Sequence, residues 1–118
     1  MPIGDVQQRY PKLWRENEAQ QNENFSWPGG ETYRVFRRRV LRAVNAIARR
    51  HEGKRVLVVT HAGVINQVLG TIRGQSPAHW ESPRPRNASI TGVQWGRNEA
   101  IVEFFDDCSH LEQSGAAG

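Results

Sequence analysis

The clearest pattern in the chain lies between residues 33 and 51, where apolar side chains recur every three or four positions. One stripe is formed by Tyr33, Phe36, Val40, Val44, Ile47 and His51. The opposite face carries Arg34, Arg38, Arg42, Asn45 and Arg49. This spacing is that of an amphipathic α-helix, and Gly53 stands where a left-handed residue would end it. We therefore predict a long helix over about 33–51.

The next segment reads as a strand, a tight turn and a second helix. Residues 55–60, RVLVVT, are apolar and mostly β-branched without polar alternation, which is typical of a strand covered on both faces in a parallel sheet. His61-Ala62-Gly63 then breaks the run. Apolar residues resume at helical spacing from Val64, and Gly70 and Gly74 with Pro77 are placed to end the helix.

The two ends of the chain carry weaker signals. Short helices are predicted near residues 4–9 and 11–20, followed by a loop at the proline and glycines of 25–30. Residues 88–95 and 100–105 are rich in β-formers and are joined by Gly96-Arg97-Asn98, which predicts a hairpin. The small residues of 113–118 predict a flexible tail.

Composition limits the chain to one domain and places its charge unevenly. The sequence has 118 residues, 37% of them hydrophobic, with a formal net charge of +4. Residues 34–55 hold nine basic groups and one acidic group, a net of +8, so the other 96 residues carry −4. The basic helix could meet nucleic-acid phosphates through Arg34, Arg37, Arg38, Arg42 and Arg49. We favour a solvated helix face, because no aromatic interleaving or binding motif accompanies the charge.

Several site classes are excluded or disfavoured. A lone cysteine, Cys108, forms no internal disulfide or thiol pair, and His79 and His110 lack partners at metal-ligand spacing, so we expect no metal and no cofactor. No apolar run spans a membrane, and residues 1–10 lack a signal-peptide core. We therefore expect a cytoplasmic location and no membrane partner.

His61 is the strongest candidate for chemistry. It follows a strand predicted to be buried and opens a helix, and both the carboxyl edge of an α/β sheet and the first free N–H groups of a helix attract phosphate. A histidine there can donate to a phosphoryl oxygen or attack phosphorus. The alternative is a packed histidine that only shapes the turn. Arg84 and Arg86 could clamp an anion, although we favour an ordinary exposed loop.

Five segments in order carry a family resemblance. They are 5–11 (DVQQRYP), 28–33 (PGGETY) with Arg39-Val40, 56–65 (VLVVTHAGVI), 87–91 (NASIT), and Asp106 with His110-Leu111. Together they resemble the histidine phosphatase superfamily, also called phosphoglycerate mutase-like. The resemblance implies an α/β fold of three layers and transfer of a phosphoryl group from a small phosphomonoester through a phosphohistidine. By it, His61 matches the second active-site histidine, which contacts the phosphoryl group, and Ala62 and Gly63 match the turn at the substrate pocket.

One departure from the family shapes the remaining expectations. Family members begin with a strand ending in Arg-His-Gly, whose histidine is phosphorylated, and this motif is absent from the 118 residues. We therefore expect residues 1–112 to form the carboxyl-terminal part of a partial α/β/α domain that is inactive alone. It should self-associate or bind an amino-terminal half. A phosphate-binding module without turnover and an arginine-rich nucleic-acid binder remain the alternatives.

Overall fold

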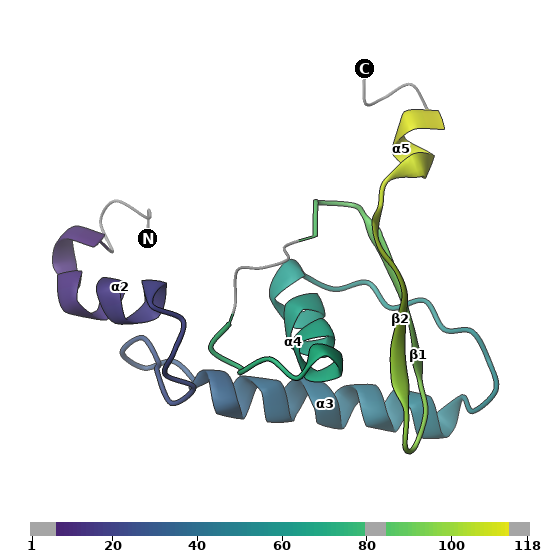
Figure 1. The fold of residues 1–118 in the computed structure, drawn as a ribbon, viewed down its shortest axis with the longest axis horizontal. Coiled ribbons are helices and arrows are strands. Elements are labelled where there is room, and N and C mark those ends of the chain that lie inside the picture. The colour runs from purple at the N-terminus through teal and green to yellow at the C-terminus, as the bar shows by residue number, and fades with distance from the viewer. Residues whose placement is uncertain (1–6, 80–84, 114–118) are drawn as a thin grey trace.

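The long helix α3 is the base on which the other elements rest (Figure 1). In the computed structural model, which describes residues 7–79 and 85–113, α3 spans Tyr33–Arg50. It begins where the Thr32 side-chain oxygen accepts a hydrogen bond from the Val35 N–H at 3.1 Å. His51 caps its end, and Gly53 takes the left-handed conformation at φ +75°. The predicted helix is confirmed.

The chain before α3 is helical and then folds back as a loop. Residues 7–9 are helical and α2 spans Pro11–Glu18, close to the predicted 11–20, whereas residues 1–6 lie outside the described part. Phe25 in the loop is buried, packed edge-on against Trp27 and stacked on Tyr33. The Tyr33 hydroxyl donates a hydrogen bond to Asn17, so the loop and α2 are both attached to the first turn of α3.

Helix α4 spans Ala62–Arg73 and packs on α3. It is capped at its carboxyl end by Gly74 in the left-handed conformation, as predicted, whereas Gly70, also predicted to end the helix, lies inside it. Leu69 is only 1% exposed, and Val40 of α3 is also buried. The apolar stripes of the two helices therefore meet.

The predicted hairpin is confirmed. Strands β1 (Ile90–Trp95) and β2 (Ala100–Asp107) pair antiparallel, with Trp95 opposite Ala100 and irregular register on both sides of Gly92. A short helix that the pattern did not predict, α5, follows at Ser109–Gln113. Apart from Gln113, the predicted tail lies outside the described residues.

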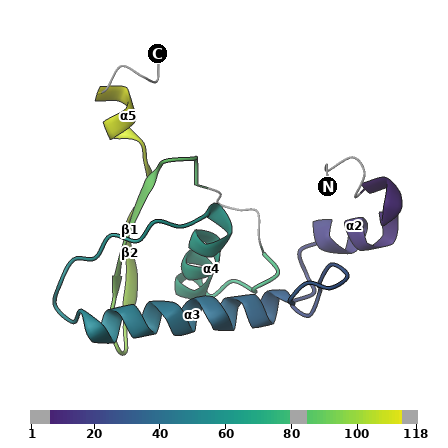
Figure 2. The same cartoon turned by 180° about the vertical axis from the view of Figure 1, so that it is seen from behind.

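The strand predicted over 55–60 is wrong. These six residues form an open connection from α3 to α4, and none of them pairs with another strand of the described chain (Figures 1 and 2). A parallel strand needs a neighbour for its backbone groups, and β1 and β2 pair with each other instead. The β-branched composition alone does not supply that neighbour.

The architecture is mixed α/β, as predicted. Both views show α3 running along one side of the molecule, with α4 and the hairpin standing on it (Figures 1 and 2). Helix α4 also contacts β2. Among the described residues the sheet has two strands. The buried apolar residues in that part are few: Phe25, Val40, Leu69, Ala78 and Cys108.

Candidate functional site

His61 occupies the N-cap of α4. Its backbone is extended, at φ −113° and ψ 159°, and its carbonyl accepts hydrogen bonds from the N–H groups of Val64 at 3.1 Å and Ile65 at 3.2 Å. The imidazole forms no capping bond, and the residue is exposed. The backbone of His61 thus starts the helix while its side chain is left accessible to a ligand.

Two backbone donors accompany the imidazole. In the described part of the chain, the N–H groups of Ala62 and Gly63 form no backbone hydrogen bond, as is usual for the first turn of a helix. They lie at the positive end of the dipole of a 12-residue helix. The three consecutive residues predicted for the site therefore present one side-chain group and two N–H groups at one helix end.

The first turn of α4 borders on a small cluster from α3. A methyl group added at Gly63 would lie 4.0 Å from the Phe36 ring, and the Arg39 guanidinium stacks over that ring at 5.3 Å from its centroid. Arg39 donates three hydrogen bonds to the Glu31 carboxylate, the shortest at 2.6 Å, and this hydrogen bonding raises the pKa of Arg39. Glu31 therefore has a structural partner in Arg39.

Arg37 departs from the sequence interpretation, which grouped it with the basic face. Its Nε donates to Gln67 Oε1 at 2.8 Å and its Nη1 donates to the Gln75 carbonyl at 2.5 Å. Gln67 in turn donates to the Pro77 carbonyl at 3.0 Å. Burial lowers the pKa of Arg37. Arg37 thus links α3 to α4 and to the loop that follows α4. Its guanidinium is not part of the exposed basic face of α3.

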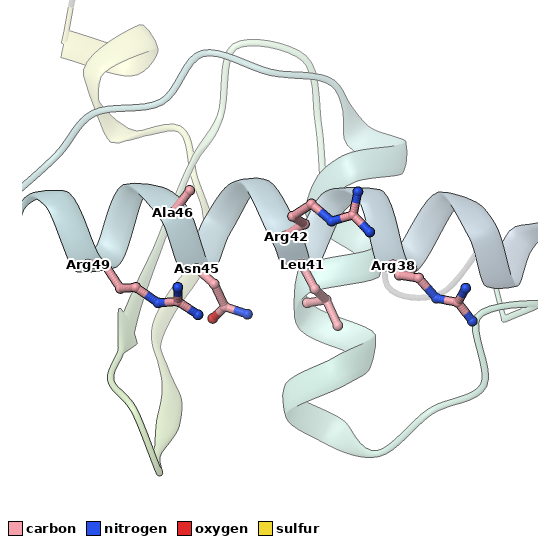
Figure 3. Close-up of a pocket in the computed structure, with 6 residues that line it drawn as sticks. All are labelled: Arg38, Leu41, Arg42, Asn45, Ala46 and Arg49. Carbon is pink, nitrogen blue, oxygen red and sulfur yellow. The ribbon is translucent and has the colours of Figure 1, made fainter.

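The remaining arginine face of α3 forms a shallow groove of about 410 Å³ (Figure 3). All six lining residues come from this helix: Arg38, Leu41, Arg42, Asn45, Ala46 and Arg49. The Trp95 indole N–H donates to Asn45 at 2.8 Å, which attaches the hairpin to the helix. Arg34 is paired with Glu23 at 2.6 Å. The groove contains none of the predicted site residues.

Arg86, considered above as part of an anion clamp, already has an anionic partner. Its backbone N–H donates to Asp106 Oδ1 at 2.7 Å and its Nε donates to Oδ2 at 2.8 Å. The backbone N–H of Arg86, followed by its side chain, holds the pKa of Asp106 below its usual value. Arg84 lies outside the described residues. Arg86 therefore holds its loop to β2.

Neither a metal nor a membrane is suggested by the described residues. They contain no group of three histidine, cysteine or carboxylate side chains placed to hold a metal ion. None of their helices is long and apolar enough to cross a bilayer.

Comparison with known proteins gives consistent results. The model of the histidine phosphatase superfamily (branch 1) matches residues 1–107. A metal-independent phosphoserine phosphatase of Arabidopsis thaliana is 31% identical over 96% of this chain and 49% of its own length. A probable phosphoglycerate mutase GpmB of Erwinia tasmaniensis is 33% identical over 86% and 49%, respectively. The solved structure of Bacillus stearothermophilus YhfR superposes with a TM-score of 0.79 at 25% identity, covering 92% of this chain and 54% of YhfR. The chain thus spans about half the length of these relatives.

Proposed function

Because the chain belongs to the histidine phosphatase superfamily, branch 1, we propose that it takes part in phosphoryl transfer from a small phosphomonoester. The observation that carries the proposal is the accessible His61 imidazole at the N-terminus of α4, next to two unused N–H groups. Such an arrangement can neutralise negative charge on an oxyanion. The similar proteins include both a phosphatase and a probable mutase, so transfer to water and transfer to another hydroxyl group both fall within the proposal.

His61 acts in this scheme by binding and donation. The transferring phosphoryl group spreads its charge over three equatorial oxygens, and catalysis depends on donors already in position around them. The imidazole N–H donates to one oxygen, and the N–H groups of Ala62 and Gly63 face another. These donors are held by the start of α4, so little reorganisation is needed when the charge develops.

The nucleophile comes, in our proposal, from a complementary half-domain, either on the same polypeptide or on another. The histidines of the 118 residues are His51, His61, His79 and His110, and none follows an arginine and precedes a glycine. The relatives carry a comparable length of chain outside the match. His61 and the helix N–H groups can stabilise charge on the phosphoryl group. A covalent phosphoryl intermediate also needs a nucleophile, and His61 cannot fill both roles.

A reconstitution assay tests this function. The chain is mixed with the part of the Arabidopsis relative that lies outside the match, and release of phosphate from phosphoserine and from a chromogenic ester is measured. We expect no turnover by the chain alone and turnover by the mixture. His61→Ala should lower kcat of the mixture by about 10²- to 10³-fold, the loss of one preorganised donor. His51→Ala, which removes an exposed histidine at the end of α3, is the matched control.

Two results would contradict the proposal. One is turnover by the chain alone at about 1 s⁻¹ or faster, a typical enzymatic rate. The other is an unchanged rate per folded molecule in His61→Ala.

Phosphate binding without turnover is the second candidate function, since the same donors bind an oxyanion. It would show as His61-dependent affinity for phosphate in a mixture that folds but releases no product.

A further inference from the structure

The groove on α3 is bounded by two rows of side chains. Residues four apart on a helix stand in a row along its surface. The six lining residues form two such rows, 38–42–46 and 41–45–49, and the groove runs between them (Figure 3). This is the surface form into which a row of side chains from another helix packs.

The positive charge of the groove is not neutralised by the described part of the chain. Elsewhere on α3, Arg34 is paired with Glu23 and Arg39 is paired with Glu31. By contrast, no ion pair with a described residue is formed by the three exposed arginines of the groove, Arg38, Arg42 and Arg49. The first two stand toward one end of the groove and the third stands at the other end. Uncompensated charge on α3 is therefore concentrated along this groove.

The middle of the groove is lined by uncharged side chains. Leu41 is half-buried there and Ala46 is exposed. Asn45 already accepts the hydrogen bond from the Trp95 indole N–H at 2.8 Å. The groove thus offers cations toward its two ends and apolar contact between them.

We propose that the groove binds an amphipathic acidic helix of a partner protein, in which positions i, i+4 and i+8 carry a carboxylate, an apolar side chain and a second carboxylate. Such a row spans about 12 Å, and Arg38 to Arg49 spans about 16 Å, at about 1.5 Å per residue, so long side chains bridge the difference. A guanidinium binds a carboxylate through two parallel N–H groups, which gives each end of the partner row a matching donor. The apolar side chain between the carboxylates then lies against Leu41 and Ala46.

A nucleic-acid strand fits the groove less well than a helix does. Sequence-tolerant binding of a single strand uses aromatic side chains on which bases stack, and none of the six lining residues is aromatic. A phosphate backbone would also leave the contacts at Leu41 and Ala46 unused, because it offers charge alone. The observations therefore favour a protein helix.

The groove lies on the side of α3 that faces away from α4. Its lining residues stand about 100–240° around the helix axis from Val40, which is buried in the contact with α4, at about 100° per residue. Figure 3 looks onto this side, with α4 behind α3. The complementary half-domain is assigned to the neighbourhood of His61, at the start of α4, so it and the helical partner occupy different sides of α3. The proposal does not rest on phosphoryl transfer.

Fluorescence anisotropy with a labelled helical peptide tests the charge pairing. The peptide has about 20 residues, enough to hold a helix, and carries Glu, Leu and Glu at i, i+4 and i+8. We expect Arg42→Glu to weaken its binding at least about tenfold, since a like charge replaces the partner. Of two peptides that each have one glutamate replaced by lysine, one should bind Arg42→Glu more tightly than it binds the wild type. Arg15→Glu on α2, with the same change in net charge at an exposed position, is the matched control and should bind as the wild type does. No binding by the wild type, or equal effects of Arg42→Glu and Arg15→Glu, would overturn the proposal.

Ala46→Lys separates helix docking from attraction by charge alone. Lysine is a good helix former, and at this exposed position it fills the groove while it adds a positive charge. We expect the acidic peptide to bind at least about fivefold more weakly, because its apolar side chain no longer fits. A single-stranded DNA oligonucleotide of the same net charge should bind no more weakly than it binds the wild type. Tighter binding of both probes, or tighter binding of the oligonucleotide than of the peptide by the wild type, would overturn the proposal. Circular dichroism of each variant checks that the helices are retained.

Discussion

Asp106 joins the loop that precedes β1 to the open end of the hairpin, where β1 begins and β2 ends. It accepts from the Arg86 backbone and side chain, and its own N–H donates to the Thr91 hydroxyl at 3.2 Å. Its backbone lies in the left-handed region at φ +59°, a conformation that aspartate and asparagine tolerate better than most residues. The carboxylate thus fixes an unusual backbone turn and the start of the hairpin together.

The stability of the chain should therefore depend on the Asp106 charge. The pKa of this carboxyl is lowered in the folded state, mainly by the Arg86 N–H. Its contribution is full above the unfolded pKa of about 4 and is lost as the pH falls through the folded pKa. We expect Asp106→Asn, which keeps the left-handed backbone, to melt below the wild type at pH 7 and together with it at strongly acidic pH. Thermal melts from pH 2 to 7 measure this, with Glu103→Gln on β2 as the control. A gap independent of pH would contradict the assignment.

At the level of elements, the contact between α3 and α4 depends on a glycine, Gly70, which has no side chain. Gly70 lies on the buried face of α4, and a methyl group added there would stand 2.6 Å from Nη2 of Arg37. The absence of a Cβ lets the guanidinium pass to Gln67 and the Gln75 carbonyl. A glycine that is unfavourable for the helix alone is thus used in the packing of two helices.

Two alanine substitutions in α4 separate these effects. Alanine gains up to about 1 kcal/mol over glycine in a helix, and Gly63→Ala should show this gain because its methyl group meets only Phe36 at 4.0 Å. Gly70→Ala should instead destabilise by about 1 kcal/mol, since displacing Arg37 costs charged hydrogen bonds worth about 1.5–3 kcal/mol. Urea unfolding of both variants gives the comparison. Equal stabilisation by the two would show that Arg37 shifts without loss.

For the whole molecule, the folded shape is open for its length. The radius of gyration is 16.3 Å, against about 13.5 Å for a compact domain of 118 residues. The principal extents are 46, 41 and 21 Å, and α3 extends past α4 toward both ends (Figure 1). Few apolar side chains are buried, and the run at 56–59 is exposed. Stability should therefore depend on what covers that run.

Association should accordingly appear in the melting temperature. A partner that binds the folded chain stabilises it by mass action, so each tenfold rise in partner concentration adds up to about 1.4 kcal/mol and a few degrees. We expect Tm of the wild type to rise as the unmatched part of the Arabidopsis relative is added, and to rise less for Val59→Lys, which places a charge in the exposed run. Differential scanning fluorimetry over two decades of partner concentration measures both. A constant wild-type Tm would show that the exposed run does not take this partner.

Local sequence patterns predicted the longer helices and the hairpin, because these elements depend on interactions between residues that are close in the chain. The stripe from Tyr33 to Ile47 predicted α3, Gly74 the end of α4, and Gly96-Arg97-Asn98 the hairpin, because helix periods, caps and tight turns are short-range properties. The sequence likewise placed His61 at a helix entrance, since a break between an apolar run and a helical period is readable in the residues alone.

Only the tertiary structure decided which residues are partners across the chain. Arg37 and Arg38 are adjacent and alike in sequence, yet one bridges two helices and the other lines an open groove, because Gly70 makes room for the first. The pairing of Arg86 with Asp106, 20 residues further along the chain, is likewise visible only in the folded structure. The run at 55–60 has the composition of a buried strand, but a strand exists only when another backbone pairs with it, and that neighbour is not specified by the run itself.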